Sequence, residues 1–301
     1  MKLLVAEIRG ETILPLHETS EQTRLGAGFY ETHRLESARI QLTARAAARF
    51  AEIAREMGAT RLRVIATSAA RDAENRSELT AALETATGVF VEVISGEQEA
   101  DWGFIGVTTN AELAGYDLLV MDVGGGSTEF ILGHAGDKSP RFRQSFQLGS
   151  VRLLERFRPT EPPRLDELSA LRSWLGEFLR SEVRPALTPY WGPSPNRRAL
   201  GIGGTTAILA LIHHAKIEFD RDLIEATTFS ATTLQGLVEH LWSLPLTQRR
   251  QLPGLPPERA DVILFGAAIY EAIMRELDLP TLGISLRGLR YAALLAHGPD
   301  D

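Results

Sequence analysis

The stretch LVMDVGGGSTEF has the residue types of a turn that binds phosphate and metal. Its apolar run Leu118–Met121 suits a strand buried on both faces, with Asp122 near the carboxyl end. Gly124–Gly126 leave backbone N–H groups open to an anion, and Ser127 adds a hydroxyl. Glu129, two residues further on, shares a strand face with Ser127. The pattern suits a phosphate bridged to Mg²⁺, which prefers a few carboxylates plus water and phosphate oxygens.

The alternative interpretation of this stretch is a glycine-rich hairpin in which Asp122 only forms the turn. Two better-known phosphate motifs are excluded. No Lys precedes the hydroxyl residue, as a Walker loop requires, and a strand follows the glycines where a dinucleotide-binding fingerprint has a helix.

A second glycine turn lies in GIGGTTAIL, where a short strand leads through Gly203–Thr205 into a helix. Helix N-termini attract phosphate, so this turn is a second candidate anion site. Its alternative interpretation, which we favour for this turn taken alone, is a loop packed tightly under the helix.

Two further stretches place charged residues directly after strands. ISGEQEADWGFIGV puts Glu97 and Glu99 at a helix start, where acids are ordinarily stabilising, and we favour that role for Glu97. The stretch ATSAARDAENRSEL presents four polar side chains: Arg71, Asp72, Asn75 and Arg76. Their alternative interpretation is a capped helix start with solvated charges, which we favour for Asp72 and Arg76.

Composition limits the class of protein. The chain has 301 residues, long enough for two domains, and a net charge of 32 − 39 = −7. A mildly acidic chain does not suggest a DNA-binding or membrane-surface protein. It contains no cysteine, which excludes disulfides and thiolate metal sites, and no apolar run reaches the ~18 residues of a spanning helix. We expect a soluble cytoplasmic protein.

Strands that alternate with helices predict an α/β protein. We expect strands at 3–8, 61–67, 89–94, 118–123, 128–132, 199–201 and 281–285. We expect helices at 39–57, 76–87, 97–107, 151–157, 165–183, 206–214, 233–243, 260–277 and 286–296. The break at Gly115-Tyr116 predicts two domains, 1–116 and 117–301.

Taken together, these stretches resemble the exopolyphosphatase / guanosine pentaphosphate phosphohydrolase (Ppx/GppA) family, of the actin, sugar-kinase and Hsp70 ATPase superfamily. The matching pieces also include TRLGAG, FQLGSVRLLE and LPGLPPERADVILFGA, and they follow the family order over nearly the whole chain. The resemblance implies two ribonuclease-H-like domains flanking a cleft, with the last helix, 286–297, packing back on the first domain. The chain resembles the short, two-domain form.

The resemblance also implies an activity and residue roles. Members release the terminal phosphate of inorganic polyphosphate or guanosine pentaphosphate by metal-assisted attack of water. By position, Glu99 is similar to the general base and Arg71 to an arginine facing the phosphate. The Mg²⁺-organising carboxylates are Asp122 and Glu129. The phosphate-binding residues are Gly124, Gly125, Gly126, Ser127, Gly203, Gly204 and Thr205. Phosphoryl transfer needs such positioning and charge neutralisation more than covalent help.

The chain departs from the family pattern at its start. Members begin with a phosphate turn of the type DxGxNS on a strand hairpin, and MKLLVAEI resembles only the second strand of that hairpin. We expect the true start to lie upstream. The alternatives are a pseudoenzyme, or another segment that supplies the missing ligands. We expect the 301-residue chain to be less stable than an extended form and impaired in catalysis. Leu286 also replaces an acid common in the family, with no consequence that we can assign.

Basic side chains could extend a track for a long polyanion: Arg24, Arg71, Arg197, Arg198, Arg249 and Arg250. For the pairs 197–198 and 249–250 we favour surface solvation. His213 and His214 have no matching partner and are interpreted as structural or surface residues rather than ligands.

Two other functions remain open from the sequence. One is a non-hydrolytic sensor of guanosine tetra- or pentaphosphate, favoured by the missing first turn. The other is a kinase or ATPase of the same superfamily, disfavoured by Glu99 and by the lack of a substrate-domain insertion. The family resemblance suggests a homodimer.

Overall fold

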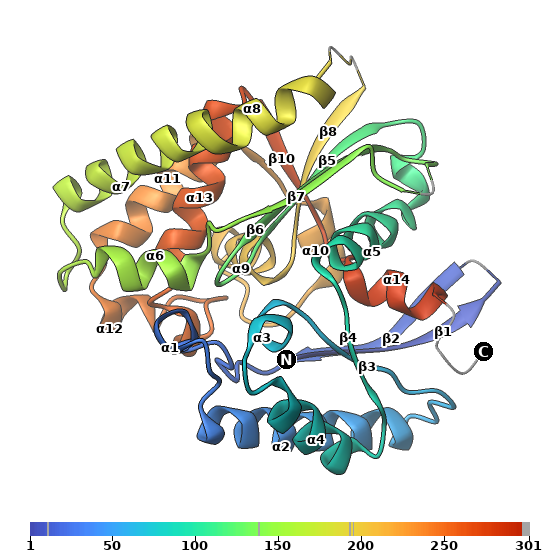
Figure 1. Cartoon of the computed structure of the whole chain (residues 1–301). Coiled ribbons are helices and arrows are strands. Elements are labelled where there is room, and N and C mark those ends of the chain that lie inside the picture. The colour runs from blue at the N-terminus through green and yellow to red at the C-terminus, as the bar shows by residue number, and fades with distance from the viewer. Residues whose placement is uncertain (11, 138, 193, 195, 297–301) are drawn as a thin grey trace. The chain divides into compact units, whose positions relative to one another are not determined.

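The computed structural model describes residues 1–10, 12–137, 139–192, 194 and 196–296. The chain divides into two compact units (Figure 1). The first consists of Met1–Glu99 and the chain from Ala293 onward, and the second of Ala100–Ala292. None of the described helices is both long and apolar enough to cross a membrane.

Among its described residues, the first unit contains four strands and four complete helices, together with the start of a fifth helix and the end of the last one. Its strands are β1 (Lys2–Arg9), β2 (Thr12–Ser20), β3 (Val64–Ala66) and β4 (Val91–Val93). Its helices are α1 (Phe29–Thr32), α2 (Ser37–Glu56), α3 (Ser68–Asp72), α4 (Arg76–Thr87) and the start of α5 (Gly96–Thr108). β1 pairs with β2 antiparallel, and β3 pairs with β4 parallel, in two separate two-stranded sheets.

Helix packing supports both strand pairs of the first unit. Leu3 and Val5 of β1 pack with Phe50 and Ala54 of α2. The alanine-rich sequence of α2 allows close contact with α4, and their apolar faces enclose a second cluster with β3 and β4. Isolated strand pairs are marginally stable, so this helical cover is what holds them.

The second unit is built on one six-stranded sheet. The strands are β5 (Asp117–Val123), β6 (Thr128–His134), β7 (Phe142–Phe146), β8 (Arg197–Ile202), β9 (Thr228–Ser230) and β10 (Thr281–Ser285). The order is β7-β6-β5-β8-β10-β9. β5, β8 and β10 are parallel, whereas β6, β7 and β9 run antiparallel to their neighbours.

Helices cover this sheet. The α-helices are α6 (Ser150–Phe157), α7 (Leu165–Phe178), α8 (Arg184–Leu187), α9 (Gly204–His213), α10 (Arg221–Ala226), α11 (Ala231–Ser243), α12 (Leu246–Arg249), α13 (Ile263–Glu276) and α14 (Leu289–Leu295). A π-helical turn, Leu179–Val183, links α7 to α8, and short 3₁₀ turns lie at Ala111–Leu113, Thr188–Tyr190 and Pro257–Arg259.

β5 is buried on both faces, as its unbroken apolar sequence predicts. Leu119 and Met121 belong to the large cluster formed with α7, α9, α11 and α13. Leu118 and Val120 point to the opposite face and pack with Phe104 of α5. All four side chains have 0% exposure. Asp122 therefore stands at the end of a fixed strand.

The compact units divide at a different point from the sequence break at Gly115-Tyr116. They separate inside α5, between Glu99 and Ala100. Beyond Glu99, the helix packs against the sheet of the second unit, where Phe104 is fully buried. The chain from Ala293 onward returns to the first unit, where Arg63 donates hydrogen bonds to the carbonyl oxygens of Ala293 and Ala296.

The α/β class and most helices are confirmed, but several elements differ from expectation. The predicted strands 61–67 and 89–94 shorten to β3 and β4. The predicted helix 165–183 ends as an α-helix at Phe178 and continues as the π-helical turn. The elements β2, β7, β9, α1, α3, α8, α10 and α12 were not predicted. β2 contains Pro15 and only a weak alternation, so its sequence carries little strand signal.

Candidate functional site

Asp122 and Glu129 face each other across the β5–β6 hairpin. The antiparallel register pairs these two residues directly. Directly opposed residues project from the same sheet face with Cβ atoms about 5 Å apart, and two like charges placed this way are destabilising. The pair is therefore a place where a bound cation would be stabilising.

Hydroxyl groups orient the Glu129 carboxylate. Ser127 Oγ donates to Glu129 Oε1 at 2.6 Å, and Ser145 Oγ of β7 donates to the same oxygen at 2.7 Å. The shared face of Ser127 and Glu129 is thus confirmed. Both donors bind Oε1, and Glu129 is held close to the glycine turn.

The glycine turn is held through its carbonyl groups by the start of α6. Ser150 N donates to Gly124 O at 3.0 Å, and Val151 N donates to Gly125 O at 2.9 Å. Arg152 Nε donates to Gly126 O at 2.9 Å. In the described part of the chain, no hydrogen bond is made by the N–H groups of Gly125 and Gly126. The turn therefore presents N–H donors that an anion could accept.

The second glycine turn lies directly against Asp122. A methyl group added at Gly203 would be 2.4 Å from Asp122 Oδ1, so only glycine fits there. Its φ of 89° also favours glycine. Thr205 Oγ1 donates to Val123 O at 3.0 Å and ties the turn to β5. The structure thus brings the acid and both predicted glycine turns together.

Arg259 lies at the second glycine turn, a position that sequence analysis did not predict. A methyl group on Gly204 would be 3.4 Å from Arg259 Nη1, which places this guanidinium beside the first residue of α9. The first N–H groups of α9 have no acceptor within the helix. Arg259 lies in LPGLPPERADV, a stretch that matched the family without any residue being assigned a role.

Tyr270 of α13 contacts both β5 and β8, because its hydroxyl lies 3.4 Å from Ile202 O of β8. Its hydroxyl donates to Met121 O at 3.1 Å and accepts from Val123 N at 3.4 Å. Burial, and then the nearby charge of Asp122, raises the pKa of Tyr270 well above its ordinary value. The phenol therefore remains a neutral donor and fixes the backbone on both sides of Asp122.

The first unit holds a second cluster, built on the parallel pair β3–β4. The carboxyl ends of parallel strands meet at one edge, and the helices that follow there, α3 and α5, carry Arg71 and Glu99. Arg71 Nη1 lies 3.2 Å from Glu99 Oε2 and also donates to Ile94 O at 3.2 Å. Glu99 N donates to Ser95 O at 2.9 Å, which places Glu99 in the first turn of α5. Arg71 and Glu99 are thus brought together.

Asn75 corrects one interpretation. Rather than capping a helix, its buried side chain accepts from Leu35 N at 2.8 Å and donates to Leu35 O at 3.0 Å. Asp72 and Arg76 are exposed, as favoured. Glu97 is also exposed and lies in the first turn of α5.

The prediction that Arg249 is solvated at the surface is wrong, because this residue is only 2% exposed. Arg249 donates to the carbonyl oxygens of Ala260 and Leu244, so it is a structural tie. Arg197 is half-buried and stacks on Trp191, whereas Arg198 and Arg250 are exposed. His213 and His214 are exposed, and His214 Nε2 lies 3.0 Å from Thr227 Oγ1.

A divalent metal fits the acid pair of the second unit. Among the described residues, no group of three or more His, Cys, Asp or Glu side chains is arranged to hold a metal ion. An Asp–Glu pair is nevertheless a donor set that Mg²⁺ uses, because water and phosphate oxygens complete its octahedral shell.

Comparison with known proteins identifies the family of this chain. The profile of the Ppx/GppA phosphatase family matches residues 4–297. Exopolyphosphatase 2 of Mycobacterium tuberculosis is 33% identical over 288 residues, which cover 92% of this chain and 87% of the relative.

Solved structures give the same result for the fold. The crystal structure of the Aquifex aeolicus Ppx/GppA family member has a TM-score of 0.78 at 26% identity, covering 98% of this chain and 92% of its own. An exopolyphosphatase from Cytophaga hutchinsonii has a TM-score of 0.85 at 24% identity, covering 97% and 92%, and shares the fold. The architecture is that of the actin-like ATPase superfamily. The chain belongs to the Ppx/GppA phosphatase family and is a hydrolase of that family.

Proposed function

We propose that this protein uses Mg²⁺ to release the terminal phosphate of inorganic polyphosphate or guanosine pentaphosphate. The observation that carries the proposal is the acid pair Asp122–Glu129, which lies beside the Gly124–Ser127 turn and against Gly203. Two carboxylates, N–H donors and a helix N-terminus are what a metal-bound phosphate chain requires.

The proposed roles in the second unit follow from these contacts. Asp122 and Glu129 would hold the metal, which when bound supplies positive charge to the phosphate oxygens. The N–H groups of Gly125 and Gly126 bind phosphate oxygens, and those at the start of α9, from Gly204 to Thr205, bind others. Arg259, beside Gly204, offsets the charge that develops as the phosphoryl group leaves.

The proposed roles in the first unit fall to the ion pair. Glu99 acts as the general base that orients and deprotonates the attacking water. Arg71, 3.2 Å from Glu99, holds that carboxylate and faces the phosphate. The support is the family resemblance of both stretches, together with the contact between the two side chains. Phosphoryl transfer needs this kind of positioning more than a covalent intermediate.

The test is phosphate release from polyphosphate and from guanosine pentaphosphate, with Mg²⁺ and after chelation. We expect release by the native protein, loss on chelation, and a fall in kcat/KM of at least about 100-fold, or about 2.7 kcal/mol, for Asp122→Asn. Asp222→Asn, an exposed acid of the same unit, is the matched control and should keep native activity.

Two outcomes would contradict the proposal. Chelator-insensitive release, or full activity in Asp122→Asn, would remove the acid pair from the reaction. Tight binding of guanosine pentaphosphate without phosphate release would favour the non-hydrolytic sensor instead.

A further inference from the structure

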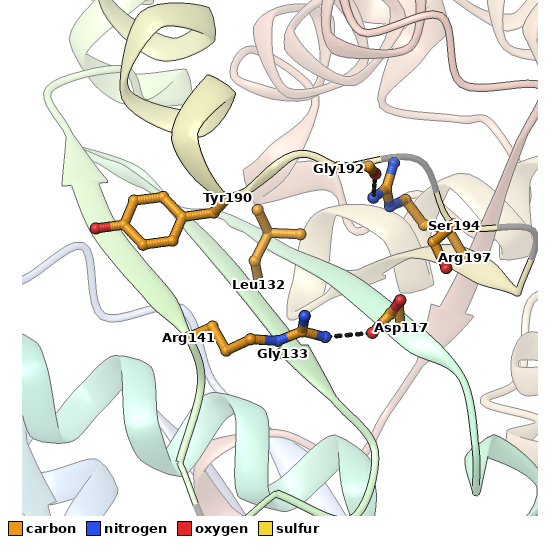
Figure 2. Close-up of a pocket in the computed structure, with 8 residues that line it drawn as sticks. All are labelled: Asp117, Leu132, Gly133, Arg141, Tyr190, Gly192, Ser194 and Arg197. Atoms are coloured by element: carbon orange, nitrogen blue, oxygen red, sulfur yellow. Dashed lines mark hydrogen bonds and ion pairs between the residues drawn. The ribbon is translucent and has the colours of Figure 1, made fainter.

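A small polar cavity lies at the edge of the second-unit sheet opposite to Asp122. Its volume is about 70 Å³, and the residues that line it include Asp117, Arg141, Ser194 and Arg197 (Figure 2). Asp117 opens β5 and pairs in register with Arg197, which opens β8. The cavity is therefore built where two parallel strands begin, while the acid pair lies where β5 ends.

The acid in this cavity already has its partners. Arg141 Nη2 forms an ion pair with Asp117 Oδ1, and His134 Nδ1 lies 3.3 Å from the same oxygen. The hydrogen bond from Ser194, and then the bond and charge of Arg141, lowers the pKa of Asp117 against the effect of burial. Arg141 is also 4.0 Å from Asp137, so its charge is balanced.

Arg197 is the second cationic residue that lines this cavity. Its guanidinium lies 4.0 Å from the centre of the Trp191 ring and donates to Gly192 O. Within the described part of the chain, its buried Nε has no hydrogen-bond partner and no carboxylate forms an ion pair with it. Burial accordingly lowers the pKa of Arg197. A buried donor without an acceptor is destabilising, and more so when the group is charged.

We propose that this cavity binds a small free oxyanion, with Arg197 as its main ligand and Ser194 beside it. A stacked guanidinium with an open Nε–H matches the fork geometry in which arginine binds phosphate or carboxylate oxygens. One water needs roughly 10–15 Å³ of such a cavity, so about 70 Å³ holds a phosphate-sized ion but not a nucleotide.

This site is separate from the proposed catalytic one, because Asp117 and Asp122 lie at opposite ends of β5. Failure of the oxyanion proposal would leave the phosphohydrolase proposal standing, and the reverse also holds. Inorganic phosphate is the natural probe, with sulfate and acetate as separate arms that distinguish tetrahedral from planar anions.

The experiment is a titration of the native protein with phosphate at constant ionic strength, followed by the NMR signals of the Arg197 Nε–H and the Trp191 indole N–H. The Arg197 signal is assigned by its loss in Arg197→Lys. We expect a saturable shift of both signals. Arg197→Met should weaken the affinity reported by the Trp191 indole at least tenfold, by the energy of a charge-assisted bond, about 1.4 kcal/mol.

Arg198→Met is the matched control. The Arg198 guanidinium also stacks on an aromatic ring, at 4.1 Å from Tyr116, but it donates to the Tyr116 hydroxyl at 2.9 Å. The Arg198→Met substitution should leave the affinity for phosphate unchanged. Absence of a saturable shift in the native protein would mean that the cavity holds water only and would overturn the proposal. Native affinity in a folded Arg197→Met would do the same.

Discussion

The two units use the same kinds of elements but assemble their strands differently. In the second unit, β5 is hydrogen bonded on both sides, to β6 and β8, inside a six-stranded sheet. In the first unit, β1–β2 and β3–β4 stay separate pairs, and no described strand joins them. The residues of β3 are all partly exposed, whereas the last four of β8 are buried.

This difference explains how the site residues are distributed. The second unit has a fully buried strand that delivers an acid into a glycine turn, and no described strand of the first unit does so. The backbone donors that we propose for an anion and the carboxylates that we propose for the metal therefore lie in the second unit. In the first unit, the residues to which we assign roles are side chains, Arg71 of α3 and Glu99 of α5.

Glycine packing shows the same contrast. In the second unit, a methyl group at Gly133 would be 2.4 Å from the Phe104 ring, and one at Gly149 would be 2.3 Å from Gly125 O. At the described glycines of the first unit, the nearest atom to such a methyl group is 3.4 Å away, at Gly28. In the second unit, rings and carbonyl groups thus pack directly against the backbone of these glycines. At the described glycines of the first unit, no atom approaches so closely.

The largest expected effect is that of Gly149→Ala in the second unit, which we compare with Gly26→Ala in the first. Gly149→Ala should lower the free energy of unfolding by about 3 kcal/mol, because a backbone carbonyl must move, and it should reduce phosphate release by displacing the glycine turn. Gly26→Ala, whose new methyl group would lie 3.7 Å from Ala69 Cβ, should change stability by under about 1 kcal/mol. Chemical denaturation measures both, and equal effects would break the comparison.

A smaller effect is expected at Asn75, which carries a polar clamp in the first unit. Asn75→Ala leaves the N–H and C=O of Leu35 without partners and should cost about 2 kcal/mol. Asn110→Ala, in the second unit, removes only a bond from Glu112 N and should cost about 1 kcal/mol or less. Thermal unfolding measures both losses of stability. A larger loss for Asn110→Ala than for Asn75→Ala would contradict the idea that side-chain hydrogen bonds stabilise the first unit.

The smallest effect concerns Asp117, the acid at the other end of β5. Its folded-state pKa is lowered, chiefly by the Ser194 hydrogen bond, so its contribution exists above the unfolded pKa of about 3.9 and is lost as pH falls through the folded value. The stability gap between native protein and Asp117→Asn should be under about 1 kcal/mol at pH 7 and shrink below about pH 4. A difference in stability that grows as the pH falls would contradict this expected direction.

The sequence predicted the parts of the fold where local pattern and packing agree. The run Leu118–Met121, with its following acid and glycines, identified the central strand because burial on both faces leaves no alternation. β2 and β7 were not predicted because partly exposed strands show only a weak alternation of apolar and polar residues. In addition, β2 contains Pro15, which is unusual in a strand. The division inside α5 depends on contacts of Phe104, which no local pattern reveals.

The candidate site was predictable where motif residues are close in sequence. Asp122 and Glu129 follow from the hairpin register, and Arg71 with Glu99 from a parallel strand pair. Arg259 was assigned no role, because its position depends on its contact with Gly204, which lies far away in the sequence. Arg197 was named only as a candidate for a polyanion track, with surface solvation favoured, because no local pattern marks its stacking on Trp191. Arg249 was misjudged for the same reason, since its carbonyl partners define its burial.

The most direct test of the account separates binding from turnover in the two units. Polyphosphate affinity with Mg²⁺ and phosphate release are measured for Glu99→Gln in the first unit and Asp122→Asn in the second, with Glu97→Gln as the matched control on the same helix turn. The account predicts that Glu99→Gln loses turnover by at least about 1,000-fold but keeps native affinity, while Asp122→Asn loses Mg²⁺-dependent affinity. Retained turnover in Glu99→Gln, or native Mg²⁺-dependent binding in Asp122→Asn, would contradict it.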